Sequence, residues 1–415
     1  MHTTVHDTLA CGIEYGVAPM PERHLVAFQI RMLAGACSDP EPKLGLAHIV
    51  EQTIDMGTAK RDARALSDAF DAIGAVHRAA VGRETTTFSC AVLPEHFETA
   101  MALHAEMLRT PTFPEDRVVV AIDLAKQDLV ALEDDAPALA DKRLSRLVFG
   151  PILGRHPLGE QSTLETLTRE DVVEHWRSYF HAGRMIVTIA GPIDDARAAH
   201  ILAEHFDGFG QAAPAGRTPF KVEFKASTTH HDKPLEQEQI GIAWPGVCAT
   251  HDDFPIQQVV LGILSGGMSG RLFTEIREKQ GLVYWVAAWQ DTPRGAGMIF
   301  VGASTKPDRC DKTCATLLHE VDRLADDVTS DELERAIVGI VAADETRGDS
   351  TRARCAELAG DIFHFGKPIP TDEKIAKIEA VTIEDVKRYL TDYPRDQLCV
   401  LTLGPRPLST ATAAC

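Results

Sequence analysis

The sequence predicts an α+β protein built from two homologous halves, each a β-sheet layered with helices. Three observations lead to this prediction. The chain has 415 residues, a length that suits two domains of about 200 residues better than one core. Strand patterns with alternating apolar residues are mixed with long helical patterns in each half. Finally, several sequence landmarks occur twice, in the same order and at nearly the same spacing.

The clearest repeated landmark is a capped helix followed by a strand. TREDVVEHWRSYF starts at Thr168 and precedes MIVTIAGP, while TIEDVKRYL starts at Thr382, 214 residues later, and precedes LCVLTLGP. Threonine is a favoured residue at the start of a helix, and the apolar runs ending in Gly-Pro are typical of strands. Pro94 in FSCAVLPEH and Pro307 in IFVGASTKPD are 213 residues apart. We interpret the chain as a tandem duplication.

The two halves are expected to join near GQAAPAGRTP, whose Gly, Pro and Ala residues suit a linker. This predicts an N-terminal domain at residues 1–210, a linker at 211–219 and a C-terminal domain at 220–415. Segments such as HLVAFQIRM and TTTFSCAVL predict strands, and EDRVVVAIDLAKQDLVALEDD predicts a long helix. Two such domains with a linker could enclose a cleft between them.

Composition and charge exclude several functions. The net charge of −19 argues against nucleic acid as a partner, because binding phosphates needs a basic face. No stretch approaches about 18 uninterrupted apolar residues, and the N-terminus lacks the pattern of a secretory signal. The nine cysteines are odd in number and scattered, which fits reduced thiols better than disulfides. We therefore expect a cytoplasmic protein that binds neither nucleic acid nor a membrane.

The segment GLAHIVEQTIDMGT contains an incomplete metal motif. His48 and Glu51 are three residues apart, and Gln52 stands where a second histidine would complete H-x-x-E-H. In that motif two imidazoles on one helical face bind one Zn²⁺, and the glutamate acts on the bound water as general base. A neutral amide is rarely a zinc ligand. On spacing alone, an ordinary His–Glu pair on a helix explains the segment better than a metal site.

Longer stretches of the chain carry a family resemblance. GLAHIVEQTIDMGTAKRDARALSDAFDAIGA and then GRETTTFSCAVLPEHFETAMALHAEML resemble the zinc-site domain of the pitrilysin/insulinase peptidases, peptidase family M16. SGGMSGRLFTEIREKQGLVYWVAAW is similar to the hallmark of that family's second domain, and HPLGE is in place at 156–160. The resemblance runs through nearly the whole chain. It implies a clamshell of two homologous α+β domains around a cleft that encloses peptide substrates.

The resemblance also assigns roles to residues of the incomplete motif. It implies that His48 matches the first zinc ligand, Glu51 the general base, and Gln52 a ligand position that has lost its histidine. The third ligand, a glutamate in the family, falls in AKQDLVALEDDAP at either Asp128 or Leu129, depending on the alignment. With two ligand positions changed, we expect no tight zinc binding by this chain alone. Zinc would then be supplied by a partner subunit, or held here by an altered ligand set.

Two nearby residues have competing interpretations. His77 lies near the expected edge strand, and it is either a replacement ligand or a partly exposed strand residue. Glu84, in GRET, matches a carboxylate that is common near the site in the resembling family, but it could equally pair with a basic side chain.

A second set of candidate residues lies in REKQGLVYW. Arg277 and Tyr284 are seven residues apart across a helix end broken by Gly281. The resemblance implies that such a pair reaches toward the substrate carbonyl. A guanidinium and a phenol can stabilise the oxyanion that develops as water attacks a peptide carbonyl. A helix-end arginine beside a packed tyrosine is the alternative, and the surrounding motif favours the functional interpretation.

Altered ligands beside a retained arginine and tyrosine lead to three hypotheses. The preferred one is the non-zinc subunit of a heterodimeric metalloendopeptidase, whose homologous partner carries H-x-x-E-H. The second is an active zinc metallopeptidase with an unusual ligand set. The third is a non-catalytic structural or peptide-binding subunit. The catalytic candidates are Glu51, Arg277 and Tyr284, and the substrates expected from the resemblance are peptides.

Overall fold

The computed structural model describes residues 4–210 and 219–409, so the predicted linker at 211–219 lies outside them except for Pro219. The described residues form two compact units, and neither is continuous in sequence. The first unit runs to Val130, from Arg155 to Gly210, and over Thr346–Ile369. The second unit is made of Ala131–Gly154, Pro219–Glu345 and the residues from Pro370 to Ser409.

The first unit is built on a six-stranded sheet with the order β1-β2-β6-β3-β5-β4. β2 and β6 are parallel, and every other neighbouring pair is antiparallel. The strands are β1 (Val5–Thr8), β2 (Glu14–Pro19), β3 (Val26–Met32), β4 (Val76–Val81), β5 (Thr86–Val92) and β6 (Met185–Gly191). The helices of this part of the chain are α1 (Leu46–Thr53), α2 (Ala63–Ala72), α3 (Phe97–Arg109), α4 (Glu115–Asp134), α6 (Gln161–Leu164), α7 (Arg169–Tyr179) and α8 (Asp195–Phe206).

The second unit repeats this plan with five strands in the order β7-β11-β8-β10-β9. The strands are β7 (Ser227–Asp232), β8 (Glu238–Pro245), β9 (Val283–Asp291), β10 (Met298–Thr305) and β11 (Cys399–Gly404). The helices are α9 (Phe254–Ser265), α10 (Cys310–Asp327), α11 (Ser330–Gly348), α13 (Thr371–Glu379) and α14 (Ile383–Asp392). β7 and β11 are parallel and the remaining pairs antiparallel, as in β2-β6-β3-β5-β4. The predicted pair of homologous sheet-plus-helix domains is therefore confirmed.

The helices that first indicated the duplication begin in the same way. Thr168 precedes α7 and accepts a hydrogen bond from the Asp171 backbone N–H, while the Asp171 carboxylate accepts from the Thr168 backbone. Thr382 and Asp385 form the same reciprocal pair at the start of α14. Each pair satisfies backbone N–H groups that have no partner within the helix.

Replacing either threonine with alanine is expected to lower the free energy of unfolding by about 1 kcal/mol, because one helix-end N–H loses its acceptor. Chemical denaturation of Thr168→Ala and Thr382→Ala measures this effect in the two units separately. The two variants are controls for each other, since the local hydrogen bonds are the same. A loss in only one variant would contradict the equivalence of the two helix starts.

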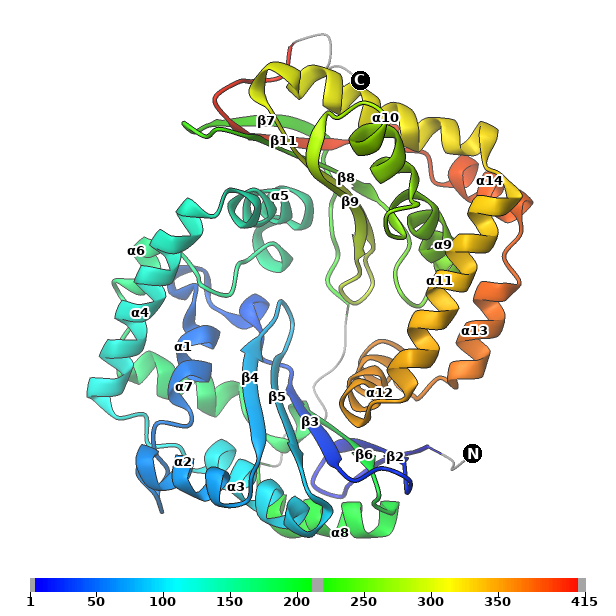
Figure 1. Cartoon of the computed structure of the whole chain (residues 1–415). Coiled ribbons are helices and arrows are strands. Elements are labelled where there is room, and N and C mark those ends of the chain that lie inside the picture. Colours follow the sequence, from blue (N-terminus) through cyan, green and yellow to red (C-terminus); the bar gives the residue numbers. More distant parts are fainter. Residues whose placement is uncertain (1–3, 211–218, 410–415) are drawn as a thin grey trace. The chain divides into compact units, whose positions relative to one another are not determined.

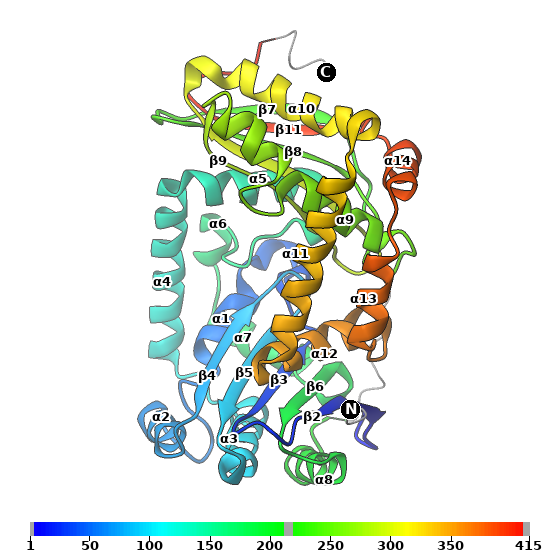
Figure 2. The same ribbon diagram turned by 45° about the vertical axis from the view of Figure 1, so that its right-hand side comes forward.

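Each sheet is covered on its second face by a helix from the other half of the sequence. In the first unit, α12 (Thr351–Phe365) packs Leu358 and Ile362 against small side chains such as Ala27 of β3 and Ala190 of β6. These alanines alternate with Phe28 and Ile189, which face the main core, so α12 lies on the opposite face. Figure 1 and Figure 2 both show α12 beside β3 and β6.

The second unit receives the corresponding helix from the first half. α5 (Ala136–Leu153) lies along β8 and β11. A side chain at Gly241 of β8 would place its Cβ 2.8 Å from the Cδ2 of Leu144 in α5, so glycine leaves room for the leucine at this close approach. Both faces of each sheet are therefore covered by helices.

Two composition-based expectations concern helices and cysteines. Within residues 4–210 and 219–409, no helix has both the length and the apolar character needed to cross a bilayer. The cysteines in these ranges are free thiols, and most are buried. They pack there as small apolar side chains.

Candidate active site

Helix α1 carries the incomplete metal motif, and a buried aspartate fixes its start. Gly45 has a positive φ of 97° just before the helix. The Asp39 carboxylate accepts hydrogen bonds from the backbone N–H groups of Gly45 and Ala47, both at 2.8 Å. Burial raises the pKa of Asp39 to about 7, against the effect of these hydrogen bonds. Asp39 was not identified from the sequence, although its place a few residues before a helical pattern is typical of a capping residue.

The three motif residues share one face of α1, and Glu51 is the most buried of them. Ile49 and Val50 are fully buried, whereas the side chain of His48 is 15% exposed and Gln52 is exposed. His48 Nδ1 lies 3.7 Å from Glu51 Oε2, and the Gln52 amide donates to the same Glu51 oxygen at 2.7 Å. The structure therefore brings His48, Glu51 and Gln52 together as the spacing predicts.

The ionisation of this cluster is set mainly by burial. Burial raises the pKa of Glu51, the hydrogen bond from Gln52 opposes that rise, and the charge of Asp55 adds to it. Burial also lowers the pKa of His48, while the negative charge of Asp128 acts in the opposite direction. A neutral imidazole is the form that can bind a metal or accept a proton.

The third-ligand position has two candidates with different environments. Asp128 is exposed on α4 and acts electrostatically on His48. Leu129 packs against the core of the first unit. Across residues 4–210 and 219–409, no group of three His, Cys, Asp or Glu side chains is placed to hold a metal ion. With one imidazole and an amide bonded to the neighbouring carboxylate, the residues of α1 do not fit a tetrahedral zinc site.

His77 and Glu84 lie in the same unit but do not complete such a site. His77 is exposed on β4 and stacks on Phe70, with ring centroids 4.1 Å apart and planes at 27°. Its edge also meets the buried His104 at a centroid distance of 6.1 Å. Glu84 is buried between β4 and β5, where its carbonyl oxygen accepts from the Gly35 N–H at 3.2 Å. Packing against Phe70 gives His77 a structural role.

Asp55 belongs to this region and was missed in the sequence. It lies one turn after Glu51, and its charge raises the Glu51 pKa. Burial raises the pKa of Asp55 itself, and His77 acts to lower it. The spacing of four residues between Glu51 and Asp55 was the available signal, because such residues are neighbours on a helix surface.

Restoring the family's ligand types is expected to create zinc affinity. In Gln52→His with Asp128→Glu, position 52 supplies an imidazole on the same helical face as His48. We expect zinc affinity to rise by more than about 100-fold, since even outer-shell partners of a zinc ligand change affinity by 10–100-fold. Titration of the metal-free protein with zinc, followed by calorimetry, measures the rise. The double variant carrying His48→Ala is the control, and equal affinity with and without His48 would contradict the expectation.

Arg277 and Tyr284 are held side by side by a tight turn in the second unit. Arg277 lies in η5, a π-helical segment at Phe273–Glu278. Tyr284 is the second residue of β9. Gly281 turns the chain with a φ of 57°, and its N–H donates to the Arg277 carbonyl at 3.1 Å. A left-handed residue at a helix end is favoured when it is glycine. The turn thus places Tyr284 next to Arg277, as the sequence predicts.

Two aromatic rings pack against the Arg277 guanidinium, and these contacts do not use its N–H groups as hydrogen-bond donors. The Cζ atom of Arg277 lies 4.9 Å from the ring centroid of Phe273 and 5.6 Å from that of Tyr284. Among the residues described in the structure, no carboxylate forms an ion pair with Arg277. Tyr284 is 74% exposed. The cation–π contacts orient the arginine, and its N–H groups and the tyrosine hydroxyl remain available to an oxyanion.

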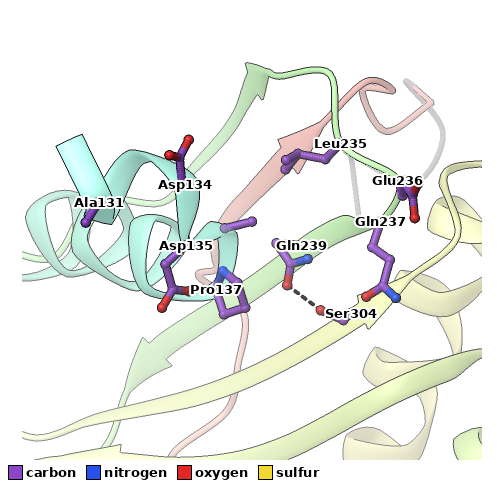
Figure 3. Close-up of a pocket in the computed structure, with 10 residues that line it drawn as sticks. Ala131, Asp134, Asp135, Pro137, Leu235, Glu236, Gln237, Gln239 and Ser304 are labelled. Atoms are coloured by element: carbon purple, nitrogen blue, oxygen red, sulfur yellow. Dashed lines mark hydrogen bonds between the residues drawn. The ribbon is translucent and has the colours of Figure 1, made fainter. Parts of the chain in front are cut away.

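A cavity of about 600 Å³ also lies in the second unit, between the start of α5 and strands β8 and β10. Figure 3 shows Asp134, Asp135 and Glu236 around it, and the hydrogen bond from Ser304 to Gln239 across it. Asp135 caps α5 by accepting from the Ala138 N–H at 3.1 Å. None of the residues selected from the sequence lines this cavity.

Comparison with protein families finds two models that match successive parts of the chain. Residues 19–157 match "Insulinase (Peptidase family M16)", and residues 166–339 match "Peptidase M16 inactive domain". Among curated proteins, an uncharacterized zinc protease of Rickettsia bellii is 26% identical, covering 94% of this chain and 95% of its own length. An uncharacterized zinc protease of Bacillus subtilis is 25% identical over 90% of this chain and 92% of its own.

Solved structures show the same fold over the whole chain. The peptidase M16 inactive domain from Pseudomonas fluorescens has a TM-score of 0.90 and 20% identity, covering 99% of this chain and 100% of that one. A protease from Helicobacter pylori has a TM-score of 0.88 and 15% identity, with coverages of 97% and 100%.

Proposed function

The chain belongs to the peptidase M16 family, and on this premise we propose that it is the non-zinc subunit of a two-subunit metalloendopeptidase. Its partner is a homologous chain with an intact H-x-x-E-H helix, and the substrates are peptides. In this assembly the present chain contributes Arg277 and Tyr284 to the reaction.

The proposal rests on the arrangement of Arg277 and Tyr284 in the second unit. A guanidinium held over two aromatic rings, without a carboxylate partner among the described residues, keeps its hydrogen-bond donors for another group. When water attacks a peptide carbonyl, negative charge develops on the carbonyl oxygen, and preorganised donors lower the energy of that state. A purely structural subunit would not need an exposed tyrosine beside an unpaired arginine.

The altered α1 helix supports a division of labour between two chains. Gln52 bonds to Glu51, and the exposed Asp128 is one methylene shorter than the family's glutamate ligand. Glu51 keeps the position of the general base. The altered ligand set beside it does not fit a zinc ion, whose bound water a general base would act on. It would take a catalytic role only in the second hypothesis, in which this chain binds zinc by itself.

Reconstitution with a homologous H-x-x-E-H chain tests the proposal. We expect the two purified chains to form a stable complex by gel filtration and to cleave peptides much faster together than either does alone. A chelator should abolish the activity, and zinc should be recovered with the partner. Stoichiometric zinc and chelator-sensitive cleavage by this chain alone would instead support the second hypothesis. A complex whose activity equals that of the partner alone would support the third.

A further inference from the structure

A cavity of about 390 Å³ lies in the first unit, where the start of α12 approaches strands β3, β4 and β5. It is distinct from the α1 cluster. Its wall combines apolar side chains such as Phe28 and Val76 with polar ones, which are Gln29, His77, Arg78, Ser89, Ser350 and Arg352. Arg78 comes from the edge strand β4, and Arg352 comes from the first turn of α12. Three segments that are far apart in sequence therefore place polar side chains around one cavity.

The two arginines that line the cavity have no acidic side chain beside them among the described lining residues. Among the described residues, no carboxylate lies within ion-pairing distance of Arg78 or Arg352. Asp349, the acidic residue just before the start of α12, is paired with Arg23 at 2.8 Å and is itself exposed. Both arginines are exposed, and both line the same cavity.

A third arginine lies behind the cavity wall. Arg31 shares the α12-facing side of β3 with Gln29, since the two are two residues apart on one strand. Its Nη2 makes only long hydrogen bonds, 3.5 Å to Gln29 Oε1 and 3.4 Å to the Ala356 carbonyl, both residues of the wall. The buried Nε of Arg31 has no hydrogen-bond partner among the residues that the structure describes. Burial also lowers the pKa of Arg31.

This arrangement is electrostatically incomplete without an anion. Arg31 is partly buried, and a buried N–H of a charged group that lacks an acceptor is costly. The guanidiniums of Arg78 and Arg352, which line the cavity, add to the positive potential. The start of α12, capped by Ser350, contributes the positive end of a helix dipole. An ordinary solvated surface could carry the same arginines, but all of them would be open to water. Here α12 partly covers Arg31.

We propose that this cavity binds a carboxylate group of the peptide substrate, either an acidic side chain or the C-terminal carboxylate. Arginine forms paired N–H···O hydrogen bonds that match the planar carboxylate. Arg78 and Arg352 make these contacts, and Arg31 supplies positive charge from the wall. The inference rests on the proposed function insofar as peptides are the ligands. It adds a preference for acidic peptides that the arginine–tyrosine pair does not provide.

Equilibrium binding to the full chain alone, without partner or metal, tests the proposal. The probes are fluorescently labelled peptides in which one glutamate is moved along an otherwise uncharged sequence, and the same set with glutamine. A further pair has a free or an amidated C-terminus. The variants are Arg78→Gln and Arg352→Gln, and Arg177→Gln is the control, because Arg177 is an exposed arginine of α7 in the same unit.

We expect at least one glutamate or free C-terminus to strengthen binding by about tenfold over its neutral counterpart, as charge-assisted hydrogen bonds do. Arg78→Gln and Arg352→Gln should each remove most of this preference, and Arg177→Gln should leave it unchanged. Equal binding of charged and neutral peptides, or no binding of any peptide, would overturn the proposal. Inorganic phosphate that competes as well as the free acidic peptide would overturn it in favour of a phosphate site.

The same measurements separate this inference from the proposed function. The acidic preference is read from binding to the isolated chain, whereas the proposed function is read from cleavage by the reconstituted complex. Arg277→Ala should therefore retain the preference. If the preference for acidic peptides is found but the complex is inactive, the two-subunit function is wrong and the proposal that the cavity binds a carboxylate is supported. If the complex is active but charge has no effect on binding, the cavity fails and the function stands.

Discussion

Replacing Arg277 with alanine is expected to lower the rate of peptide cleavage by the reconstituted complex by about 10²–10³-fold, as the loss of one oxyanion donor does in other enzymes. The effect should fall on kcat rather than KM, because the donor acts on charge that appears only in the transition state. Tyr284→Phe keeps the ring that packs against the guanidinium and removes only the hydroxyl. It should therefore reduce kcat without altering the position of Arg277.

Two variants make this result interpretable. Arg335→Ala removes an exposed arginine from α11 in the same unit and should leave kcat unchanged. Arg277→Lys keeps the charge but loses the fork of donors, and it should recover only part of the activity. All variants should still bind the partner in gel filtration. Unchanged kcat in Arg277→Ala would contradict the oxyanion role and leave the third hypothesis, a structural or peptide-binding subunit.

Local features of the fold were predictable because they depend on short stretches of sequence. The duplicated helix starts at Thr168 and Thr382 were read from a threonine followed by an acidic residue and an apolar pattern, and both form the expected reciprocal caps. The exchange of α5 and α12 between units was not predictable. Apolar spacing shows that a helix has a buried face, but it does not say which sheet that face will cover.

The same distinction between local and long-range features applies to the candidate site. His48, Glu51 and Gln52 are neighbours on one helix, and Arg277 lies near Tyr284 through a short turn, so the spacing alone could bring each group together. Asp39 caps α1 from outside the helix. The arginines at the proposed carboxylate-binding cavity come from three elements: Arg31 from β3, Arg78 from β4 and Arg352 from α12. Such groups become neighbours only through sheet pairing and helix docking, which no sequence pattern in the chain records.

Arg271, in the SGGMSGRL stretch just before η5, is a buried arginine at the centre of an ion-pair network. Arg271 is 5% exposed. Its Nε and Nη2 donate to the two oxygens of Glu332 at 2.6 and 2.8 Å, and it also pairs with Asp327. Glu332 further accepts from the N–H and hydroxyl of Thr329, at 3.0 and 2.9 Å. The network thus ties the start of η5 to the end of α10 and the start of α11.

Arg271→Ala is expected to lower the free energy of unfolding of the second unit by about 1.5–3 kcal/mol, because the partly buried Glu332 loses its charge-assisted hydrogen bonds. Asp327 adds little to this loss, since it is exposed and also pairs with Arg323. Chemical denaturation measures the loss. Lys377→Ala, which breaks an exposed pair with Glu373 in the same unit, should change stability by less than about 1 kcal/mol. Equal effects of the two substitutions would mean that the Arg271 network contributes no more than a surface pair.

The pH dependence of stability tests the same network independently. Burial acts to raise the pKa of Glu332, but hydrogen bonds from Arg271 and Thr329 outweigh it and lower the pKa from 4.5 to about 2. A carboxylate whose pKa is lower in the folded state stabilises the protein fully above pH 4.5, and this contribution is lost as the pH falls toward 2. Without Arg271 the largest lowering contact is gone, so the variant should lose less stability over this interval than the native chain. If both chains lose the same amount between pH 4.5 and 2, Glu332 does not depend on Arg271 for its ionised state.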